Sequence, residues 1–347
     1  MKTVLLTGGS GFFGGILKEK LLARGDSVVN VDLERDELAH PRLVSVRGDI
    51  RDRGLIDRLF SERRFDAVLH CAAVLAHESP DPKFLWSSNV EGTRTLAEAA
   101  KKHGVRRFVF TSTNCLWAKN FHRPIREDDA PEPVEAYGKS KWEAEKLLSA
   151  AAAAGDLDVV ILRTPTIMDS GRLGLLAILY EFIYEGRKVW VVGGGKNRYQ
   201  FVYAGDLADA HILAMESTAT GVFNAGSDDV KTFRTVYESV VARAATGARV
   251  ASLPRALVIP AMKVLHKLKL SPLGPYQYKM IAEDAEFDTS KIKAQMGWHP
   301  TLTNEEMLWK AYEYYAAHRD EILSRKDASA HRRAAKMGAI RILKWIS

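Results

Sequence analysis

The sequence predicts an α/β protein built on a doubly wound parallel sheet, with a smaller C-terminal lobe. Short apolar runs typical of strands recur at residues 4–7, 28–32, 43–47, 67–72, 108–112 and 159–163. Between them, apolar residues recur at three- and four-residue steps, as in amphipathic helices, over residues 15–24, 53–64, 89–103 and 138–154. Strands and helices that alternate in this way form βαβ units, which place helices on both faces of a parallel sheet.

Beyond residue 165 the periodicity loosens, and short elements alternate with Gly and Pro. We expect a smaller lobe here that supplies substrate specificity above the carboxyl ends of the strands, where ligands bind in such sheets. Its predicted elements are helices at 173–184 and 206–216 and strands at 188–192 and 222–225. The predicted division is a first domain, a substrate-binding lobe interleaved with its sheet, and a basic amphipathic tail, over residues 1–165, 166–317 and 318–347.

Three glycines, Gly8, Gly11 and Gly14, directly follow the first predicted strand. A dinucleotide pyrophosphate needs backbone N–H groups that approach closely, and the start of the next helix offers them with a positive dipole. We expect Gly8 to make the tight turn, Gly11 to lie beneath the phosphates and Gly14 to let the helix pack on its strand. A glycine-rich turn without a ligand is the alternative for this motif alone. The predicted cofactor contacts here also include Ser10, Phe12 and Phe13.

A carboxylate, Asp32, ends the second predicted strand. At this place in a Rossmann sheet an acidic side chain accepts hydrogen bonds from the adenosine ribose, and it repels the 2′-phosphate of NADP. Asp32 therefore predicts NAD as the cofactor, and a turn residue at the strand end is the structural alternative. Arg35, three residues later, keeps NADP as a second cofactor to consider. No metal site is predicted.

Composition and charge exclude several classes of protein. Of the 347 residues, 46% are apolar and 27% charged, which are ordinary values for a globular protein. The net charge of +7 is concentrated in residues 255–269 and 319–347, so the remainder is slightly acidic and no nucleic-acid partner is expected. The two cysteines, Cys71 and Cys115, indicate a reduced compartment without disulfides. Because no run of about eighteen apolar residues occurs, we expect a cytoplasmic protein.

Tyr137 and Lys141 lie four residues apart at the start of a predicted helix, so they share one helical face. A free tyrosine has a pKa of about 10, too high for ready proton exchange at neutral pH. A neighbouring ammonium stabilises the phenolate and lowers this pKa, which makes Tyr137 a candidate general acid or base. A surface pair is the alternative for these two residues alone. A hydroxyl at the end of the preceding strand, in residues 108–113, would hold a substrate oxygen.

Together these motifs resemble those of the extended short-chain dehydrogenase/reductase family, of the NAD-dependent epimerase/dehydratase type. The resemblance covers about residues 1–317 and rests on the glycine turn, on Asp32 and on the runs Gly48-Asp-Ile50, His70-Cys-Ala-Ala73, Asn89-Val-Glu-Gly-Thr93, Thr111-Ser-Thr113, Tyr137-Gly-Lys-Ser-Lys141 and Leu162-Arg163. It implies an enzyme with a catalytic triad of Thr113, Tyr137 and Lys141, in which Lys141 also binds the nicotinamide ribose.

The resemblance also implies cofactor contacts at the ends of two further strands. Asp49 and Ile50 would contact the adenine. The middle of the cofactor would be lined by Cys71, Ala72 and Ala73. A strand-end cap for Asp49 and a core position for Cys71 are the structural alternatives.

Three more residues complete the predicted cofactor contacts. Asn89 would either contact the cofactor near its ribose or cap the helix that follows it. Thr111 and Pro165 are added at the ends of their strands, and Tyr137 and Lys141 are expected to contact the cofactor in addition to their catalytic roles.

Three features bear on the branch of the family. Its dehydratases carry an Asp-Glu pair directly after the catalytic Thr, where this chain has Asn114 and Cys115, so dehydration is not expected. Its sugar-nucleotide enzymes carry a diphosphate-binding Arg seven residues before a helix-starting Asp, where this chain has Tyr199 preceded by Arg198. A one-residue offset on a strand turns the side chain to the other face. The stretch 193–214 is similar to that of 3β-hydroxysteroid and 4-carboxysterol dehydrogenases, and scaffolding shared by the family is the alternative.

Two basic segments predict contact with a membrane. Residues 254–270 mix bulky apolar residues with Lys263, Lys267 and Lys269, and residues 332–346 repeat apolar residues every third position among cations. Helices of this kind rest in a bilayer interface with their cations toward anionic headgroups. A helix packed on its own domain or on a partner subunit is the alternative.

The sequence thus predicts an NAD(P)-dependent oxidoreductase that interconverts a secondary alcohol and a ketone on a lipid-like substrate. Sterol- or hopanoid-like 3-hydroxy and 3-oxo lipids fit, as do 3-oxo acyl, sphingoid and ceramide lipids. Peripheral contact with the inner face of the membrane is expected, and the family resemblance implies a homodimer through helices 89–103 and 138–154. The first alternative is a sugar-nucleotide epimerase or 4-keto reductase. The second is a dinucleotide-sensing binding protein, which the intact triad disfavours.

Overall fold

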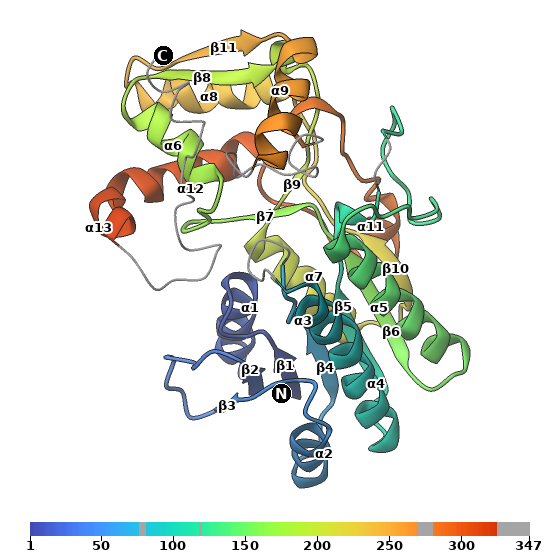
Figure 1. Ribbon diagram of the computed structural model, residues 1–347. Coiled ribbons are helices and arrows are strands. Elements are labelled where there is room, and N and C mark those ends of the chain that lie inside the picture. Colours follow the sequence, from blue (N-terminus) through green and yellow to red (C-terminus); the bar gives the residue numbers. More distant parts are fainter. Residues whose placement is uncertain (76–80, 118–119, 269–279, 325–347) are drawn as a thin grey trace.

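The computed structural model describes residues 1–75, 81–117, 120–268 and 280–324. Seven strands form one parallel sheet in the order β10-β6-β5-β4-β1-β2-β3 (Figure 1). The strand order changes direction beside β1, which is where doubly wound sheets bind their ligands. The seven strands are β1 (Thr3–Thr7), β2 (Ser27–Asp32), β3 (Leu43–Arg47), β4 (Ala67–His70), β5 (Arg107–Thr111), β6 (Asp158–Arg163) and β10 (Gly221–Asn224).

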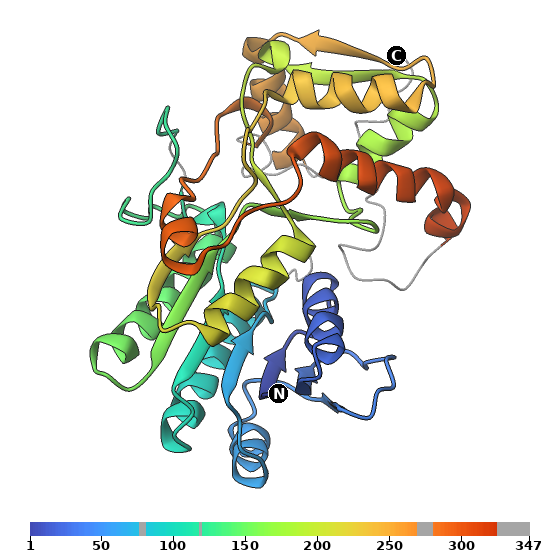
Figure 2. The same ribbon diagram turned by 180° about the vertical axis from the view of Figure 1, so that it is seen from behind.

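Helices cover both faces of this sheet. The side chains of β1 alternate between two cores, since Val4 and Leu6 lie in one and Leu5 in the other. The predicted fold class is confirmed, because both faces are apolar and both are buried. The first face carries α1 (Phe12–Ala23) and α7 (Ala204–Glu216), side by side in Figure 2, and the second carries α2 (Arg53–Glu62), α4 (Gly92–Lys102) and α5 (Ala136–Ala153).

The helix predicted at 89–103 has a different beginning. A short helix, α3 (Pro82–Trp86), leads into one π-helical turn, η1 (Ser87–Glu91), and only then does the chain continue as α4. In this region the Thr93 hydroxyl donates to the carbonyl of Asn89 over 2.7 Å. Hydrogen bonds of this kind compete with the regular helical pattern, and apolar periodicity alone does not reveal them.

The second lobe lies above the large sheet in Figure 1. It contains two short pairs of parallel strands. The sequence predicted only one of these strands, at 188–192, and only one helix of this lobe, at 173–184. Strands of three residues carry too short a pattern to predict. The pairs are β7 (Thr166–Met168) with β9 (Phe201–Tyr203), and β8 (Lys188–Val192) with β11 (Arg249–Leu253). The helices are α6 (Leu176–Tyr184), α8 (Phe233–Ala244), α9 (Arg255–Lys267), α12 (Asn304–Ala317) and α13 (Arg319–Ser324).

The C-terminal half also returns to the large sheet. The elements α7, β10 and α11 (Ser290–Met296) follow residue 166 in sequence but pack on this sheet or extend it. Trp298, directly after α11, is 1% exposed and lies in the same core as Val4. Its indole N–H donates to the carbonyl of Asp206, in the first turn of α7, over 2.7 Å. The sheet and the core on its first face are therefore complete only with residues from the second half of the chain.

Among the residues that the structure describes, no helix combines the length and the apolarity needed to cross a bilayer. The basic segment predicted at 254–270 forms α9 over its described part. The amphipathic helix predicted at 332–346 lies outside the described residues.

We expect Trp298→Ala to lower the free energy of unfolding by about 3–5 kcal/mol, because it removes a large side chain from the core shared by both halves. The control Trp298→Phe keeps most of the apolar volume and loses only the indole hydrogen bond, so it should cost about 1 kcal/mol. Urea denaturation followed by circular dichroism measures both variants. Equal losses would mean that the hydrogen bond, and not the packing, attaches this segment to α7.

Candidate functional site

The glycine turn after β1 has the close backbone approaches that its sequence predicts. Gly8 has a φ of +78°, and a Cβ placed on it would lie 2.7 Å from the backbone nitrogen of Ala72. A Cβ on Gly14 would lie 2.0 Å from the carbonyl oxygen of Gly8. Both positions therefore require glycine. Around Gly11 the nearest atom to such a Cβ is the Gly8 oxygen, at 3.2 Å, so this side of the turn is far less crowded.

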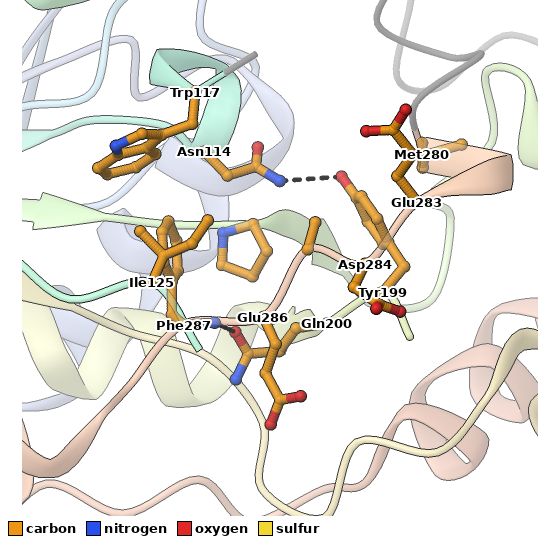
Figure 3. A pocket seen from close by; sticks show the side chains of 12 residues that line it. Asn114, Trp117, Ile125, Tyr199, Gln200, Met280, Glu283, Asp284, Glu286 and Phe287 are labelled. Carbon is orange, nitrogen blue, oxygen red and sulfur yellow. Dashed lines mark hydrogen bonds between the residues drawn. The ribbon is translucent and has the colours of Figure 1, made fainter. Parts of the chain in front are cut away.

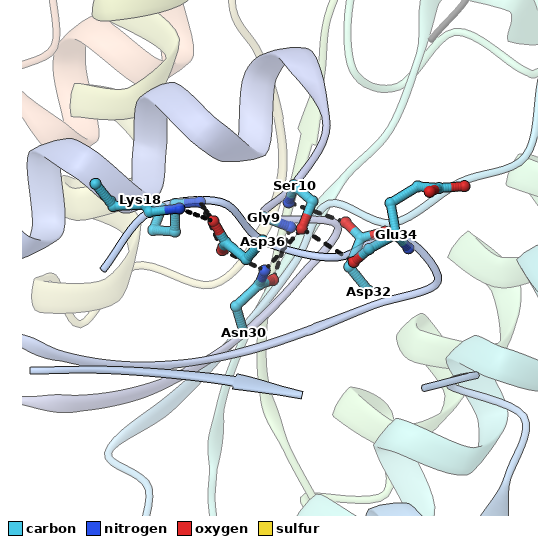
Figure 4. Close-up of polar contacts among 8 residues, drawn as sticks. Gly9, Ser10, Lys18, Asn30, Asp32, Glu34 and Asp36 are labelled. Atoms are coloured by element: carbon cyan, nitrogen blue, oxygen red, sulfur yellow. Dashed lines mark hydrogen bonds and ion pairs between the residues drawn. The ribbon is translucent and has the colours of Figure 1, made fainter. Parts of the chain in front are cut away.

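Polar side chains at the end of β2 hold this turn in place (Figure 4). The backbone N–H of Gly9 donates to Asn30 Oδ1 and that of Ser10 to Asp32 Oδ2, each over 2.9 Å. Asn30 is 1% exposed. The sequence analysis missed Asn30, although a polar residue inside an apolar strand is a usable signal, because a buried amide needs partners.

A buried ion pair extends the same network. Lys18 of α1 and Asp36 approach to 2.6 Å, with side chains 5% and 3% exposed, and Asn30 Nδ2 donates to Asp36 over 2.9 Å. The Lys18 ammonium and these hydrogen bonds keep the pKa of Asp36 below its ordinary value, against the opposing effect of burial. The loop after β2 is therefore fixed against α1.

Asp32 lies beside the glycine turn, as predicted. One oxygen accepts from Ser10 N and the other from Glu34 N, over 2.9 and 3.0 Å. Each carboxylate oxygen has a second lone pair, which leaves capacity for the hydroxyls of a ribose.

Asp49 forms an ion pair with Arg51, which the sequence analysis did not predict as a site residue. Both of its oxygens accept from the guanidinium of Arg51, the shortest contact being 2.6 Å, and this pairing lowers the pKa of Asp49. Arg51 also donates to Ser87 Oγ over 2.8 Å. Ile50 is 8% exposed and lies against Gly92, at the start of α4. The adenine contact predicted for Asp49 and Ile50 stays a prediction.

A chain of hydrogen bonds runs beneath the turn through His70, which is fully buried. Burial, followed by the Lys141 charge, lowers the pKa of His70 far below its ordinary value, so the ring is neutral. Because the Thr93 hydroxyl donates to the Asn89 carbonyl, it accepts from His70 Nε2 over 2.8 Å, and Nδ1 then accepts from Thr7 over 2.7 Å. This chain fixes the ends of β1 and β4, next to the predicted contacts Ala72 and Ala73.

Asn89 has a positioning role that neither sequence alternative described. Its side chain accepts from Val74 N over 2.8 Å and donates to Val74 O over 3.0 Å. It also donates to Ser140 Oγ over 2.9 Å. The amide therefore joins the segment after β4 to α5, the helix that carries Tyr137 and Lys141.

Thr111, Cys71 and Pro165 were predicted to contact the cofactor. The Thr111 hydroxyl lies 2.7 Å from His211 Nε2, and since His211 Nδ1 donates to a carbonyl, Nε2 is the acceptor. Burial raises the pKa of the Cys71 thiol to about 12, which suits its alternative as a core residue. Pro165 lines a pocket between the sheet and the second lobe. The cofactor contacts predicted for these three residues stay predictions.

The triad residues come from the end of β5 and the start of α5. Thr113 is 7% exposed, and its hydroxyl oxygen accepts from Cys115 N over 3.1 Å. Gly138 follows Tyr137, and a Cβ there would lie 2.3 Å from the carbonyl oxygen of Cys115. This glycine lets the first turn of α5 pack directly on the segment after Thr113. Its role was not predicted, because the contact joins residues that are distant in sequence.

Lys141 is buried, at 2% exposed, and its Nζ lies 3.8 Å from the centroid of the Phe110 ring. Desolvation lowers the pKa of this lysine to about 7, although the charges of Glu145 and Cys71 oppose the shift. An ammonium that readily loses its proton near neutral pH is suited to tune a neighbouring phenol.

Glu145, four residues after Lys141, forms a buried ion pair with Arg163 of β6. The guanidinium donates to both carboxylate oxygens, the shortest contact being 2.7 Å, and the two side chains are 1% and 3% exposed. Ser112 Oγ donates to the same carboxylate over 2.5 Å. The pair therefore connects α5, β6 and the residue before Thr113.

A pocket lies beyond the predicted triad, between the carboxyl ends of β5 and β6 and the second lobe (Figure 3). Asn114 Nδ2 donates to the hydroxyl of Tyr199 over 3.0 Å across it. Tyr199 is 2% exposed, whereas Arg198 is exposed. The side chains of these two neighbouring residues therefore point to opposite faces of the chain, as the one-residue offset of the arginine predicts. The pocket is lined by Asn114, Trp117, Ile125, Pro165, Tyr199, Gln200, Met280 and residues 283–287.

Comparison with known proteins places this site in a family. Residues 4–226, well over half of the chain, match the NAD-dependent epimerase/dehydratase family. The chain belongs to this family. It is an enzyme of the extended short-chain dehydrogenase/reductase type, as its motifs predicted.

Related proteins match between 63% and 99% of the chain. Uncharacterized protein y4nG of Sinorhizobium fredii is 33% identical over 345 residues, which cover 99% of this chain and 86% of that protein. The UDP-glucose 4-epimerase of Corynebacterium glutamicum is 30% identical over 83% of this chain and 96% of its own. The N-acetyl-α-D-glucosaminyl-diphospho-ditrans,octacis-undecaprenol 4-epimerase of Escherichia coli O157:H7 is 30% identical over 63% of this chain and 64% of its own.

Solved structures agree over nearly the whole fold. The UDP-glucose 4-epimerase of Thermotoga maritima, with UDP-glucose, has a TM-score of 0.74 at 26% identity and covers 91% of this chain and 99% of its own. Bordetella bronchiseptica WbmH, in complex with NAD+, has a TM-score of 0.73 at 28% identity and covers 92% and 99%. The named functions are those of sugar epimerases, so the sterol-dehydrogenase branch and the lipid substrate gain no support from them.

We expect Lys141→Met to abolish turnover and to stabilise the fold in a pH-dependent manner. The pKa of Lys141 is about 7 in the folded protein against an ordinary 10.5, so the unfolded chain binds more protons between these values. The free energy of unfolding of the wild type should therefore rise as the pH increases from about 7 to 10.5. The stability that Lys141→Met gains over the wild type should be largest below about pH 7 and should shrink as the pH rises. Thermal unfolding of Lys141→Met at about pH 6 and about pH 9 measures this, with the exposed Lys139→Met as control. An identical gain at both pH values would contradict it.

We expect Glu145→Gln to lower the free energy of unfolding by about 3–5 kcal/mol, because it leaves the buried Arg163 guanidinium without a counter-charge. The double variant Glu145→Met/Arg163→Met removes both charges and should be less destabilised than the sum of the single variants Glu145→Met and Arg163→Met. Denaturant unfolding of the four variants gives the coupling. Additive losses would show that the ion pair is not a unit.

Proposed function

We propose that this protein binds NAD and inverts a secondary alcohol at C4 of a sugar carried on a diphosphate. The observation that carries the proposal is the buried Lys141, placed one turn after Tyr137 on a helix packed against the segment that follows Thr113. Relatives and structural neighbours named as 4-epimerases support the sugar. The lipid oxidoreductase expected from the sequence thus gives way to its first alternative.

The glycine turn fits a dinucleotide. A Cβ at Gly8 or Gly14 would collide with backbone, while the surroundings of Gly11 are more open toward an approaching phosphate. We assign the pyrophosphate to this turn, the adenosine ribose to Asp32 and the nicotinamide ribose to Lys141. The carboxylates of Asp32 and Glu34 favour NAD over NADP. Bound NAD supplies a hydride acceptor and, once reduced, a hydride donor.

The protein's own groups handle the proton. Because the Thr113 oxygen accepts from Cys115 N, its hydroxyl hydrogen is available to donate toward the sugar oxygen. Tyr137, as the phenolate, takes the proton of the sugar hydroxyl, and the Lys141 ammonium stabilises that phenolate. Tyr137 returns the proton after the sugar ketone has presented its other face. We assign the sugar, during this reorientation, to the pocket beside Asn114 and Tyr199.

Two arginines that contact pocket-lining residues suit the diphosphate. Arg255 donates to the carbonyl of Ala282 over 2.9 Å and contacts Glu283 at 3.4 Å. The backbone of Arg198 donates to Asp284 over 2.7 Å, and its side chain is exposed. We assign the diphosphate to these two guanidinium groups, since Tyr199 holds the position where related enzymes carry an Arg.

Dehydration is not part of the proposal. The residues that follow Thr113 are Asn114 and Cys115, and the Asn114 amide donates to Tyr199. An amide does not exchange protons as a carboxylate does, so the general acid and base that loss of water needs are missing from these two positions.

Names of relatives give two carriers for the sugar, a nucleotide in one and a polyprenol in another. Both carriers are joined to the sugar through a diphosphate. We therefore propose a sugar 1-diphosphate as the substrate class.

We expect the protein to interconvert the C4 epimers of UDP-glucose or UDP-N-acetylglucosamine, observed by proton NMR of the sugar signals. Tyr137→Phe should lose about 10²-fold or more in turnover, because it removes the acid and base. The same variant should bind NAD as the wild type does, which calorimetry measures and which excludes misfolding. Wild-type turnover in Tyr137→Phe would contradict the mechanism, and reduction of keto-lipids without any epimerisation would contradict the substrate class.

A further inference from the structure

We propose that α9 docks this protein on an anionic membrane, and that the sugar diphosphate it acts on is carried by a lipid in that membrane. The choice of sugar rests on the proposed function above. The docking surface is argued separately, from the side chains of α9 and their place beside the pocket.

An apolar stripe runs along the outside of α9. Leu257, Val264 and Leu268 are 70%, 57% and 60% exposed. They are spaced by seven and four residues, and the Leu268 N–H donates to the Val264 carbonyl, so the helical turn includes Leu268. Residues at these spacings lie on one side of a helix. Large apolar side chains gathered on one exposed face mark an interaction surface.

The charge of this helix selects the partner. Residues 255–268 include Arg255, Lys263 and Lys267 and no Asp or Glu. Lys263 and Lys267 are exposed and four residues apart, which places them on neighbouring turns beside the stripe. An apolar stripe flanked only by cations complements a bilayer with anionic headgroups, because the apolar side chains enter the interface while the cations remain at its surface.

The first turn of α9, from which the stripe runs, contacts the pocket wall. Arg255, in the first turn of α9, is hydrogen-bonded to the carbonyl of Ala282 and paired with Glu283, and residues 283–287 line the pocket. Figure 1 shows α9 in the second lobe, beside β11 and α8 and away from β1. A membrane-bound protein would thus keep its dinucleotide turn in water and bring the pocket wall near the bilayer.

This arrangement distinguishes the two carriers of the sugar. A nucleotide carrier is water-soluble, so its turnover needs no apolar surface. A lipid carrier stays in the bilayer, and only its diphosphate and sugar need to reach the pocket. The stripe therefore favours the lipid carrier, whereas the two arginines suit the diphosphate of either carrier.

The test is sedimentation of the full-length protein with vesicles of phosphatidylcholine, with and without phosphatidylglycerol. We expect the wild type to bind the anionic vesicles, with binding that weakens as salt is added. The triple variant Leu257→Ser/Val264→Ser/Leu268→Ser should bind these vesicles at least about tenfold more weakly than the wild type. Leu323→Ser, an equally exposed apolar position at 52% on α13, is the matched control and should bind as the wild type does.

Several outcomes would overturn the docking surface. They are absence of binding by the wild type, equal binding by the triple variant, equal losses in the triple variant and Leu323→Ser, and conversion of a dimer to a monomer by the triple variant in analytical ultracentrifugation. The last would mean that a second copy covers the stripe. Capture of the wild type by neutral vesicles alone would refute the role of the cations.

Activity separates this inference from the proposed function. On polyprenyl-diphosphate-N-acetylglucosamine in anionic vesicles, the triple variant should turn over about tenfold more slowly than the wild type, while soluble UDP-N-acetylglucosamine should be turned over equally by both. Tyr137→Phe should bind vesicles normally and epimerise neither substrate. Equal turnover of the lipid-linked sugar by the wild type and the triple variant would overturn the inference and leave the proposed function standing. Intact, stripe-dependent vesicle binding without epimerisation by the wild type would overturn the function alone.

Discussion

The central constraint in this molecule is a lysine ammonium that is held out of water. Lys141 is covered by Phe110 and by the chain after β4, so its positive charge is costly, and its pKa falls to about 7. Glu145, one turn further along α5, opposes that fall in pKa, and its ion pair with Arg163 joins α5 and β6 to the residue before Thr113. A charge destabilised in this way responds strongly to a phenolate or a ribose placed beside it, which is the response that the proton exchange proposed for Tyr137 requires.

Close backbone approach is the second organising feature. Gly8 lets the turn meet Ala72, Gly14 lets α1 meet that turn, and Gly138 lets α5 meet Cys115. Each contact brings together segments that carry site residues from different strands. Buried polar chains then lock these approaches, through Asn30 for the turn and through His70 and Asn89 for the end of β4.

The sequence predicted those features that are local. Apolar runs separated by helical periodicity gave the sheet, glycine spacing gave the turn, and a four-residue step placed Tyr137 and Lys141 on one face of a helix. Residues whose partners are distant in sequence were missed: Gly138 and Trp298 look like ordinary helix and core residues until the fold brings Cys115 and Asp206 to them. The substrate could not be derived either, because the pocket is assembled from loops whose residues carry no periodic signal.

The return of Trp298 to the large sheet has a consequence for how this protein is made. A ribosome synthesises a chain from its N-terminus, so the glycine turn after β1 emerges before α7, β10 and Trp298 do. Its supporting helix α1, however, shares a core with α7 and with Trp298, and β10 completes the sheet edge. The half of this chain that is synthesised first is therefore finished last, and nascent chains that end before Trp298 expose an unsealed apolar face that chaperones would have to shield.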